Sequence, residues 1–196
     1  MSKRLFDFTA ALAGLVLLSP LFAATAIWIK LDSHGPVFFR QKRIGHLGVP
    51  FDIIKFRTMR ENAEDAAQLT IEHDRRITRV GRFLRRYKLD EFPQLFNVVN
   101  GSMALVGPRP EVPRYVACYP AEVRAIVLSV PPGITDWASI CYKEENAILA
   151  RTVNPEQAYL DTILPEKLKY NVRYVQERNF WTDLRIIFST FRALLR

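Results

Sequence analysis

An uncharged, largely apolar segment near the N-terminus, residues 8–29, constrains the fold of this sequence most strongly. A straight helix of that length would be about 33 Å long, which is enough to cross the hydrocarbon core of a bilayer. Ser19 and Pro20 interrupt the segment near its centre. Because proline lacks a backbone N–H and clashes with the preceding turn, we expect a sharp bend at this point. Each half of the segment is then too short to span the membrane alone.

The charges that flank this segment favour a re-entrant helix–break–helix. Lys3 and Arg4 precede it, and Lys30 and Arg40 follow it. Since basic residues tend to stay on the cytoplasmic side, both ends are expected on that side of the membrane. The Ser19 hydroxyl could satisfy a carbonyl that the proline frees. A single spanning helix is the alternative, and a cleaved signal peptide is disfavoured by the length of the segment.

The composition indicates a single globular unit with an anionic partner. The chain has 196 residues, of which 49% are hydrophobic, and its net charge is +8. That length suits one compact domain, and the apolar fraction excludes a disordered chain. The positive charge favours nucleic acid, anionic lipid or a phosphorylated substrate, without choosing among them. We expect an anchor over residues 1–35 and a cytoplasmic domain over 36–196, which together form one structural unit.

Several short elements are predicted in the domain from composition and periodicity. Two segments rich in β-branched and aromatic residues, 36–43 and 50–57, flank a turn and predict a β-hairpin. The remaining predictions are a short polar helix at 61–69, an extended segment at 103–106, and a polar loop or helix start at 144–146.

Two amphipathic segments could face either the protein or a membrane. In residues 75–88, helical spacing predicts a basic stripe of Arg75, Arg79, Arg82 and Arg86 and an apolar stripe of Ile77, Val80, Leu84 and Tyr87. The basic stripe is either a solvated face or a contact with anionic headgroups. Arg85 and Lys88 project off it and are better candidates for an internal site. In residues 180–196, one helical face would carry Phe180, Leu184, Ile187, Phe188, Phe191 and Leu195, and would pack on the domain or lie in the membrane interface.

The candidate chemistry lies at two adjacent carboxylates, Asp90 and Glu91. The sequence has neither a P-loop nor a dinucleotide-binding glycine motif. Asp90 is predicted to cap a helix over residues 91–99, with Pro93 in its first turn, and Arg109 follows in a rigid Pro-Arg-Pro frame. Arginines and a helix N-terminus bind phosphate, while a carboxylate can hold Mg²⁺ or attack phosphorus. The alternative is that Asp90 only caps the helix and Glu91 only interacts with its dipole.

A resemblance to a known family favours the catalytic interpretation. Residues 89–110, LDEFPQLFNVVNGSMALVGPRP, closely resemble the hallmark of the bacterial monotopic phosphoglycosyl transferases, also called bacterial sugar transferases. The Ser19-Pro20 break, KFRTM at 55–59 and PPGIT at 131–135 occur in the order typical of that family. The resemblance spans nearly the whole chain and corresponds to the minimal catalytic module. It implies a mostly helical α+β fold, in which a re-entrant membrane helix, a small β-hairpin and amphipathic interfacial helices surround a compact catalytic domain.

The resemblance also implies a reaction. A phosphosugar would move from a UDP-sugar to a membrane polyprenol phosphate and release UMP, at the cytoplasmic face of the bacterial inner membrane. Asp90 falls on the nucleophile that forms a covalent phosphosugar intermediate, and also on the ligand of the implied cofactor Mg²⁺. Glu91 falls on a proton acceptor or metal-side partner. This would be the first membrane step of polysaccharide assembly, with downstream glycosyltransferases as further partners and no nucleic acid.

The resemblance assigns phosphate binding to a small group of basic residues. Arg85 and Arg109 are implied phosphate clamps. Lys55 and Arg57 are further candidates, of which only one is expected to face the site. The segment after PPGIT, residues 136–139, departs from the family pattern, so the sugar preference does not carry over. The competing functions are a basic membrane-anchored scaffold and a glycosyltransferase that releases UDP; product analysis would distinguish them.

Overall fold

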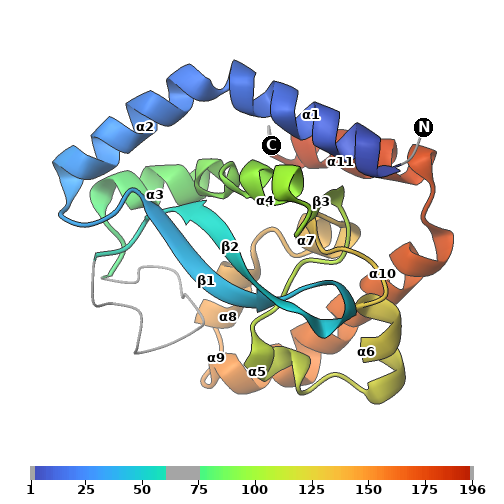
Figure 1. Ribbon diagram of the computed structural model, residues 1–196. Helices are drawn as coiled ribbons and strands as arrows, with labels where there is room; N and C mark the ends of the chain where they lie inside the picture. Colours follow the sequence, from blue (N-terminus) through green and yellow to red (C-terminus); the bar gives the residue numbers. More distant parts are fainter. Residues whose placement is uncertain (1–2, 61–75, 195–196) are drawn as a thin grey trace.

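The computed structural model describes residues 3–60 and 76–194. A long bent helix pair lies along one side of the molecule, and a twisted β-hairpin crosses beneath it (Figure 1). Short helices surround the other end of the hairpin, and the C-terminal helix returns beside the N-terminal one (Figure 1). The predicted class, α+β with mostly helical structure, is confirmed over the described residues.

The bent pair consists of α1 (Lys3–Leu17) and α2 (Ser19–Asp32), whose axes differ by 60°. Pro20 cannot donate the N–H that a continuous helix would direct to the carbonyl of Val16. The Ser19 hydroxyl donates to that carbonyl instead, at 2.8 Å. The predicted break and its hydrogen bond are therefore confirmed. Within the described residues no helix alone has the length and hydropathy of a membrane span, although the bent pair reaches them when its two helices are taken together.

The predicted hairpin is confirmed with slightly shorter strands. Strand β1 (Phe38–Ile44) pairs with β2 (Pro50–Phe56) in an antiparallel register that sets Phe39 opposite Lys55. The connecting turn contains the 3₁₀ segment η1 (His46–Gly48). The twisted hairpin extends from the end of α2 toward the short helices on the far side of the molecule (Figure 1). This path makes one end of the hairpin part of the site described below.

The basic segment forms a shorter helix than its periodicity suggests. Helix α3 (Arg79–Arg86) begins after Thr78, whose side chain accepts from the Gly81 N–H, and it buries Val80 and Leu84. The predicted apolar stripe is wrong at its two ends, because Ile77 precedes the helix in a bridge with Met59 and Tyr87 follows the helix and is 50% exposed. Arg75 and the predicted helix at 61–69 lie outside the described residues.

A small parallel sheet joins the two segments that flank the Pro-Arg-Pro frame. Strand β3 (Ala104–Val106), which confirms the predicted extended segment, pairs with β4 (Gly133–Thr135). The backbones touch at Gly107 and Gly133, where a Cβ on Gly133 would lie 2.0 Å from the Gly107 nitrogen. Only glycine permits this approach. The sheet thereby holds residues 108–110 against residues 131–135.

The remaining helices build the largest hydrophobic cluster, which includes Val112, Tyr115, Leu149, Ile163 and Leu168. They are connected by short turns. The predicted polar segment 144–146 lies at the start of one of them. In chain order they are α5 (Pro113–Val116), α6 (Ala121–Val127), α7 (Trp137–Cys141), α8 (Glu145–Ala150), α9 (Pro155–Ala158), the π-helical turn η3 (Tyr159–Ile163) and α10 (Leu164–Glu177).

The C-terminal helix α11 (Phe180–Leu194) confirms the predicted helix, and its buried residues lie outside the predicted apolar face. Asp183 and Ile186 are buried. Among the aromatic residues that the periodicity assigned to one face, Phe180, Phe188 and Phe191 are exposed. Leu195 lies outside the described residues. The helix therefore packs on the domain and also presents an apolar outer surface, which combines the two alternatives left open by the sequence.

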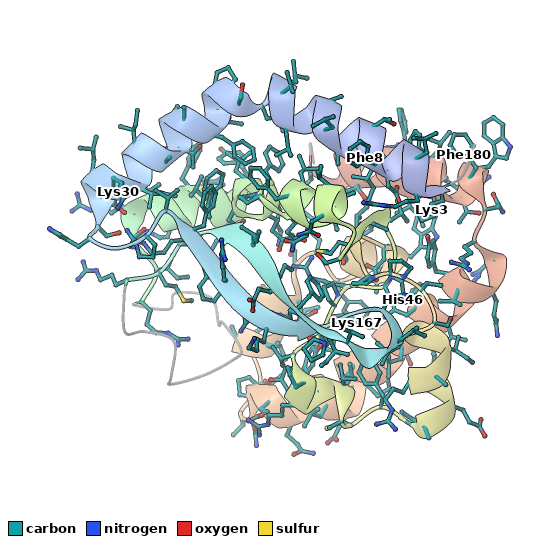
Figure 2. The ribbon with its side chains drawn as sticks, viewed as in Figure 1. Lys3, Phe8, Lys30, His46, Lys167 and Phe180 are labelled. Atoms are coloured by element: carbon teal, nitrogen blue, oxygen red, sulfur yellow. The ribbon has the colours of Figure 1, made fainter. Side chains whose placement is uncertain are left out.

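An ion pair connects α11 to the first turn of α1. The Lys3 ammonium lies 2.6 Å from the Asp183 carboxylate, and the rings of Phe6 and Phe180 are 5.4 Å apart. Figure 2 shows Lys3 and Phe180 together at one end of the bent pair and Lys30 at the other. The first turn of α1 is thus held beside the first turn of α11.

Candidate active site

A cavity of about 1180 Å³ opens between the hairpin, α1, α11 and the segments around β3 and β4. It collects side chains that are distant in the sequence. The predicted catalytic and phosphate-binding residues all line it: Lys55, Arg57, Arg85, Asp90, Glu91 and Arg109. We call the part formed by Lys55, Arg85, Asp90, Glu91 and Arg109 the Asp90 end of the cavity.

Asp90 does not cap a helix, so that prediction is wrong. Residues Leu89–Glu91 form the 3₁₀ turn η2, and the next helix, α4 (Gln94–Asn100), begins only after Pro93. The donors that a cap would use are missing: the Phe92 N–H is bonded to the Leu89 carbonyl, and Pro93 has no N–H. Asp90 is buried, and its Oδ1 atom has no hydrogen-bond partner among the described residues.

Glu91 has the opposite surroundings, since its carboxylate is held by two cations. The Lys55 ammonium donates to Oε1 at 3.0 Å. The Arg109 guanidinium donates to both oxygens, at 3.0 Å to Oε2 and in a shorter contact to Oε1. Burial alone would raise the pKa of Glu91, but Arg109 and Lys55 hold that pKa well below its ordinary value. Glu91 is therefore ionised and fixed in place at neutral pH.

Burial also governs the titration of Asp90, in the other direction. It raises the pKa of Asp90, and the adjacent Glu91 charge adds to the effect, while Lys55 and Arg85 oppose it. The two neighbouring carboxyls thus have pKa values shifted in opposite directions. A carboxylate with a raised pKa is more basic and lacks the hydrogen bonds that would stabilise its charge. The Asp90 carboxylate is therefore better suited to react with an electrophile or to bind a cation than to serve a structural role.

Arg109 is positioned from its backbone as well as its side chain. Pro108 and Pro110 restrict the chain on both sides, and the Arg109 N–H donates to Asp136 Oδ2 at 3.2 Å. The other oxygen of Asp136 accepts from the Ser139 N–H at 2.6 Å. Ser139 lines the cavity. Asp136 therefore connects Arg109 to the segment that contributes Ser139 to the cavity wall.

Lys55 and Arg57 both line the cavity but make different contacts. Lys55 binds Glu91, whereas the Arg57 guanidinium donates to the carbonyls of Ser33 and His34, at 2.7 and 2.5 Å. Strand β2 ends at Phe56, so Arg57 has left the strand and supports the turn after α2. Lys55 is thus the one of the two that contacts the carboxylate pair, and phosphate binding by Arg57 stays a prediction.

A second polar group, which the sequence did not predict, lines the cavity beyond Arg109. Glu111 Oε1 accepts from the Tyr159 hydroxyl at 2.6 Å and lies 3.4 Å from the Lys167 ammonium. Lys167 also donates to Glu145 at 3.0 Å, and Arg43 lies 3.5 Å from Glu111 Oε2. We call these five residues the Glu111 end of the cavity. Figure 2 labels Lys167, which lies across the hairpin from the bent helix pair.

The only sequence signal for the Glu111 end was the position of Glu111 directly after the Pro-Arg-Pro frame. Its partners come from β1, α8, η3 and α10, and no spacing relates them. Burial would raise the pKa of Glu111, but Lys167 and Arg43 hold that pKa below its ordinary value. Burial would lower the pKa of Lys167, but Glu111 and Glu145 raise it. The charges at this end are therefore mutually stabilised in their ionised forms.

The remaining wall of the cavity is apolar. Helix α1 contributes Phe6, Ala10 and Gly14, and helix α11 contributes Ile187 and Phe191. This wall is made by the two elements whose outer surfaces are also apolar: Leu5, Val16 and Leu17 of α1 and Phe188 of α11 are more than half exposed. A polar site and an apolar passage therefore share one cavity.

The donor set at the Asp90 end fits a magnesium ion shared with a phosphorylated ligand. No group of three or more His, Cys, Asp and Glu side chains arranged to hold a metal occurs within residues 3–60 and 76–194. Mg²⁺, however, often uses one or two carboxylates and completes its octahedron with water and phosphate oxygens. The unpartnered Oδ1 of Asp90 is the donor available for that purpose, since Glu91 is occupied by Lys55 and Arg109.

Comparison with known proteins gives the family of this chain. The sequence model of the family described as bacterial sugar transferase matches residues 1–196. The chain belongs to this bacterial sugar transferase family.

Three relatives illustrate the range of related proteins. A UDP-N-acetylgalactosamine-undecaprenyl-phosphate N-acetylgalactosaminephosphotransferase of Aeromonas hydrophila is 37% identical over 98% of this chain and 43% of its own length. A UDP-glucose:undecaprenyl-phosphate glucose-1-phosphate transferase of Caulobacter vibrioides is 38% identical over 100% of this chain and 70% of its own. The uncharacterized sugar transferase EpsL of Bacillus subtilis is 38% identical over 98% of this chain and 87% of its own.

Several of the curated relatives are much longer than the matched region. The chain spans 43%, 35%, 39% and 38% of the length of the first four. The described fold thus corresponds to the part that these proteins share.

Proposed function

We propose that this chain is a phosphoglycosyl transferase that moves a sugar phosphate from a UDP-sugar to a polyprenol phosphate and releases UMP. The observation that carries the proposal is Asp90, a buried carboxylate whose Oδ1 atom has no partner among the described residues and which lies beside cations suited to phosphate. The names of the relatives, which include transferases from UDP-sugars to undecaprenyl phosphate, support the same reaction.

In the first half of the proposed reaction, an oxygen of ionised Asp90 attacks the phosphorus that bears the sugar. The bond between that phosphorus and the bridging oxygen of the diphosphate breaks, and UMP leaves with the electron pair. An aspartyl-phosphosugar remains on the protein. Arg109 and Arg85 are suited to bind the phosphate oxygens, and the guanidinium plane of Arg109 is already oriented by Glu91.

In the second half, a phosphate oxygen of the acceptor attacks the same phosphorus. The bond to Asp90 breaks, the carboxylate is regenerated, and the product is a polyprenol diphosphate sugar. The apolar wall from α1 and α11 suits the prenyl chain of this acceptor, and it leads to the Asp90 end of the cavity. Two phosphorylated substrates with very different tails could thus meet at one carboxylate.

The acceptor requires a membrane, and we infer that the bent pair inserts as a re-entrant hairpin. The two helices qualify by length and composition only together, and their outer faces are apolar. Basic residues on both flanks favour the cytoplasmic face for both ends. We therefore propose that the catalytic domain works at the cytoplasmic face of the inner membrane and supplies downstream glycosyltransferases.

Mg²⁺ is part of this proposal, with Asp90 as its protein ligand. When bound, the ion would neutralise the charge of the diphosphate and stabilise the leaving UMP. Lys55 and Arg109 would still hold Glu91, so the protein's own contribution is to keep that carboxylate ionised beside the site. Of its two expected roles, Glu91 is better suited to that of a metal-side partner, because its lowered pKa makes it a weak proton acceptor.

The test is product analysis with protein in bilayer nanodiscs, a panel of UDP-sugars and undecaprenyl phosphate. The proposal predicts UMP in equal amount to a lipid diphosphate sugar, and UMP formation from the first half reaction even without acceptor. Release of UDP would identify an ordinary glycosyltransferase. Absence of any nucleotide product across the panel would favour the non-catalytic scaffold.

The re-entrant topology has its own test. Replacing Ser19→Ala and Pro20→Leu together removes the break and the hydroxyl that bonds Val16. The expected result is a shift toward a spanning helix, read by reaction of an introduced cysteine, Ser2→Cys, with an impermeant thiol reagent outside intact cells. The variant that keeps Ser19 and Pro20 should be protected. Labelling of that variant from outside would refute the re-entrant hairpin.

A further inference from the structure

The Glu111 end of the cavity contains buried charges that the proposed mechanism does not use. Arg43, Glu111 and Lys167 are buried or nearly so, with side-chain exposures of 19%, 10% and 8%. Moving charged groups out of water is costly unless they are paired, and replacing such a group by apolar side chains is often neutral or stabilising. A buried ionic group at the wall of a substrate cavity therefore points to a ligand.

The charge balance at this end indicates what kind of ligand it suits. Its two cations, Arg43 and Lys167, are matched by the carboxylates of Glu111 and Glu145. At the Asp90 end, by contrast, the basic side chains outnumber the acidic ones. A diphosphate is drawn to the Asp90 end, while the balanced end has no electrostatic preference for an anion. It suits a neutral ligand that needs both donors and acceptors.

The long hydrogen-bond distances at the Glu111 end leave donors and acceptors available to such a ligand. The contacts of Glu111 with Lys167 and with Arg43 are 3.4 and 3.5 Å long, at the outer limit of a hydrogen bond. A closer hydroxyl could accept from either cation and donate to the carboxylate. Vicinal hydroxyl groups are neutral, donate and accept at once, and match this arrangement.

Chain connectivity keeps the Glu111 end close to Arg109, the proposed phosphate-binding residue. Glu111 is two residues from Arg109, and the Arg109 charge acts on the pKa values of both Glu111 and Lys167. A ligand whose phosphate contacts Arg109 would therefore extend its attached ring toward the Glu111 end. The nucleotide sugar has two such rings, the sugar and the ribose.

We propose that Glu111, Arg43 and Lys167 bind vicinal hydroxyl groups of the nucleotide-sugar donor, either those of the sugar or those of the ribose. This inference rests on the proposed function, since it takes a UDP-sugar as the substrate. Glu111 and Lys167 act by contact with the ring hydroxyls, while Tyr159 and Glu145 orient them from behind.

The experiment compares Glu111→Gln with Asp183→Asn in nanodiscs. Asp183 is a matched control, because it is also a buried carboxylate that accepts from a tyrosine hydroxyl, Tyr174 at 2.8 Å, and a lysine, Lys3 at 2.6 Å, but it does not line the cavity. UMP release is measured with UDP-glucose, UDP-galactose and their N-acetylamino counterparts, and product inhibition by UMP is measured in parallel. Glu145→Gln, at a more exposed position, is a second variant in case Glu111→Gln does not fold.

The expected result is a change of about tenfold or more in the ratios of kcat/KM among donors for Glu111→Gln, with unchanged ratios for Asp183→Asn. Unchanged ratios with weaker inhibition by UMP would also support the inference and would assign the contact to the ribose. An equal loss for all donors, with unchanged UMP inhibition, would overturn it. A wild-type protein that releases no UMP from any donor would instead overturn the proposed function.

Discussion

The Asp90 end and the Glu111 end of the cavity both contain carboxylates and basic side chains, but they differ in how the carboxylates are paired. At the Glu111 end every charge has an opposite partner, and the carboxylate pKa is lowered. At the Asp90 end one carboxylate, Glu91, takes the cationic partners, and Asp90 is left buried with a raised pKa. Burial alone therefore does not distinguish the proposed nucleophile, Asp90, from Glu111; burial of an oxygen without a hydrogen-bond partner does.

The sharpest test of this difference is Asp90→Asn, which keeps the side-chain shape and removes the charge. Because an amide cannot form the proposed covalent intermediate, we expect UMP release to fall by roughly 10³-fold or more, and the phosphosugar adduct to vanish from intact-protein mass spectra. Asp52→Asn, at a half-exposed aspartate outside the cavity, is the control and should retain activity. Near-normal turnover in Asp90→Asn would remove Asp90 from the mechanism.

A second test addresses the geometry that keeps Glu91 occupied. Arg109→Lys retains the charge but loses the two-pronged contact with Glu91, so we expect kcat/KM to fall by about 10- to 100-fold. Arg124→Lys, on the exposed side of α6, is the matched control and should leave kinetics unchanged. If Arg109→Lys showed wild-type kinetics, charge alone would suffice at that position.

The pair Lys55→Met and Arg57→Met separates a contact with the site from support of the fold. Lys55→Met removes one partner of Glu91 and should reduce activity about tenfold with little change in the melting temperature. Arg57→Met frees the carbonyls of Ser33 and His34 and should destabilise the protein by roughly 2 kcal/mol. Calorimetry and UMP assays on both variants check this; the reverse pattern would assign the phosphate contact to Arg57.

The smallest expected effect concerns pH and the stability of the Glu111 end. The folded-state pKa of Glu111 lies below its ordinary value, so its stabilising contribution is present above the unfolded pKa of about 4.3 and is lost as the pH falls through the lower folded value. The difference in unfolding free energy between wild type and Glu111→Gln should be about 1–3 kcal/mol near neutral pH and shrink in acid. Denaturant titrations at several pH values measure it; a difference independent of pH would mean that the carboxylate contributes only by packing.

The sequence predicted the parts of the fold that depend on residues close together in the chain. The Ser19-Pro20 break follows from a missing N–H, and the hairpin follows from composition on either side of a turn. The bend and the strands therefore agree with the prediction to within a few residues.

The prediction that Asp90 caps a helix failed because the backbone donors that a cap would use are already bonded or missing. Asp90 has the residue type and position of a helix cap, but the 3₁₀ turn uses the Phe92 N–H and Pro93 offers none. On α11, periodicity identified the helix and its apolar face but left open whether that face packs on the domain, and three of its residues, Phe180, Phe188 and Phe191, are exposed.

Apart from the position of Glu111 after the Pro-Arg-Pro frame, the sequence contains no signal for the Glu111 end. Its members are separated by up to more than a hundred residues, and each alone resembles an ordinary surface charge. Only the packing of η3 and α10 behind the Pro-Arg-Pro segment brings Tyr159 and Lys167 to Glu111. By contrast, Asp90, Glu91 and Arg109 were identified because a short motif carries all three.

The short helix α4 follows the turn that holds Asp90 and packs alongside helix α1 (Figure 1). Its last carbonyls, those of Val98 and Val99, accept from Arg4 in the first turn of α1. Its seven residues span about 10 Å at roughly 1.5 Å per residue. Under the proposed membrane insertion of α1, this packing together with the Arg4 contacts would fix the depth at which the phosphate of a lipid acceptor meets Asp90.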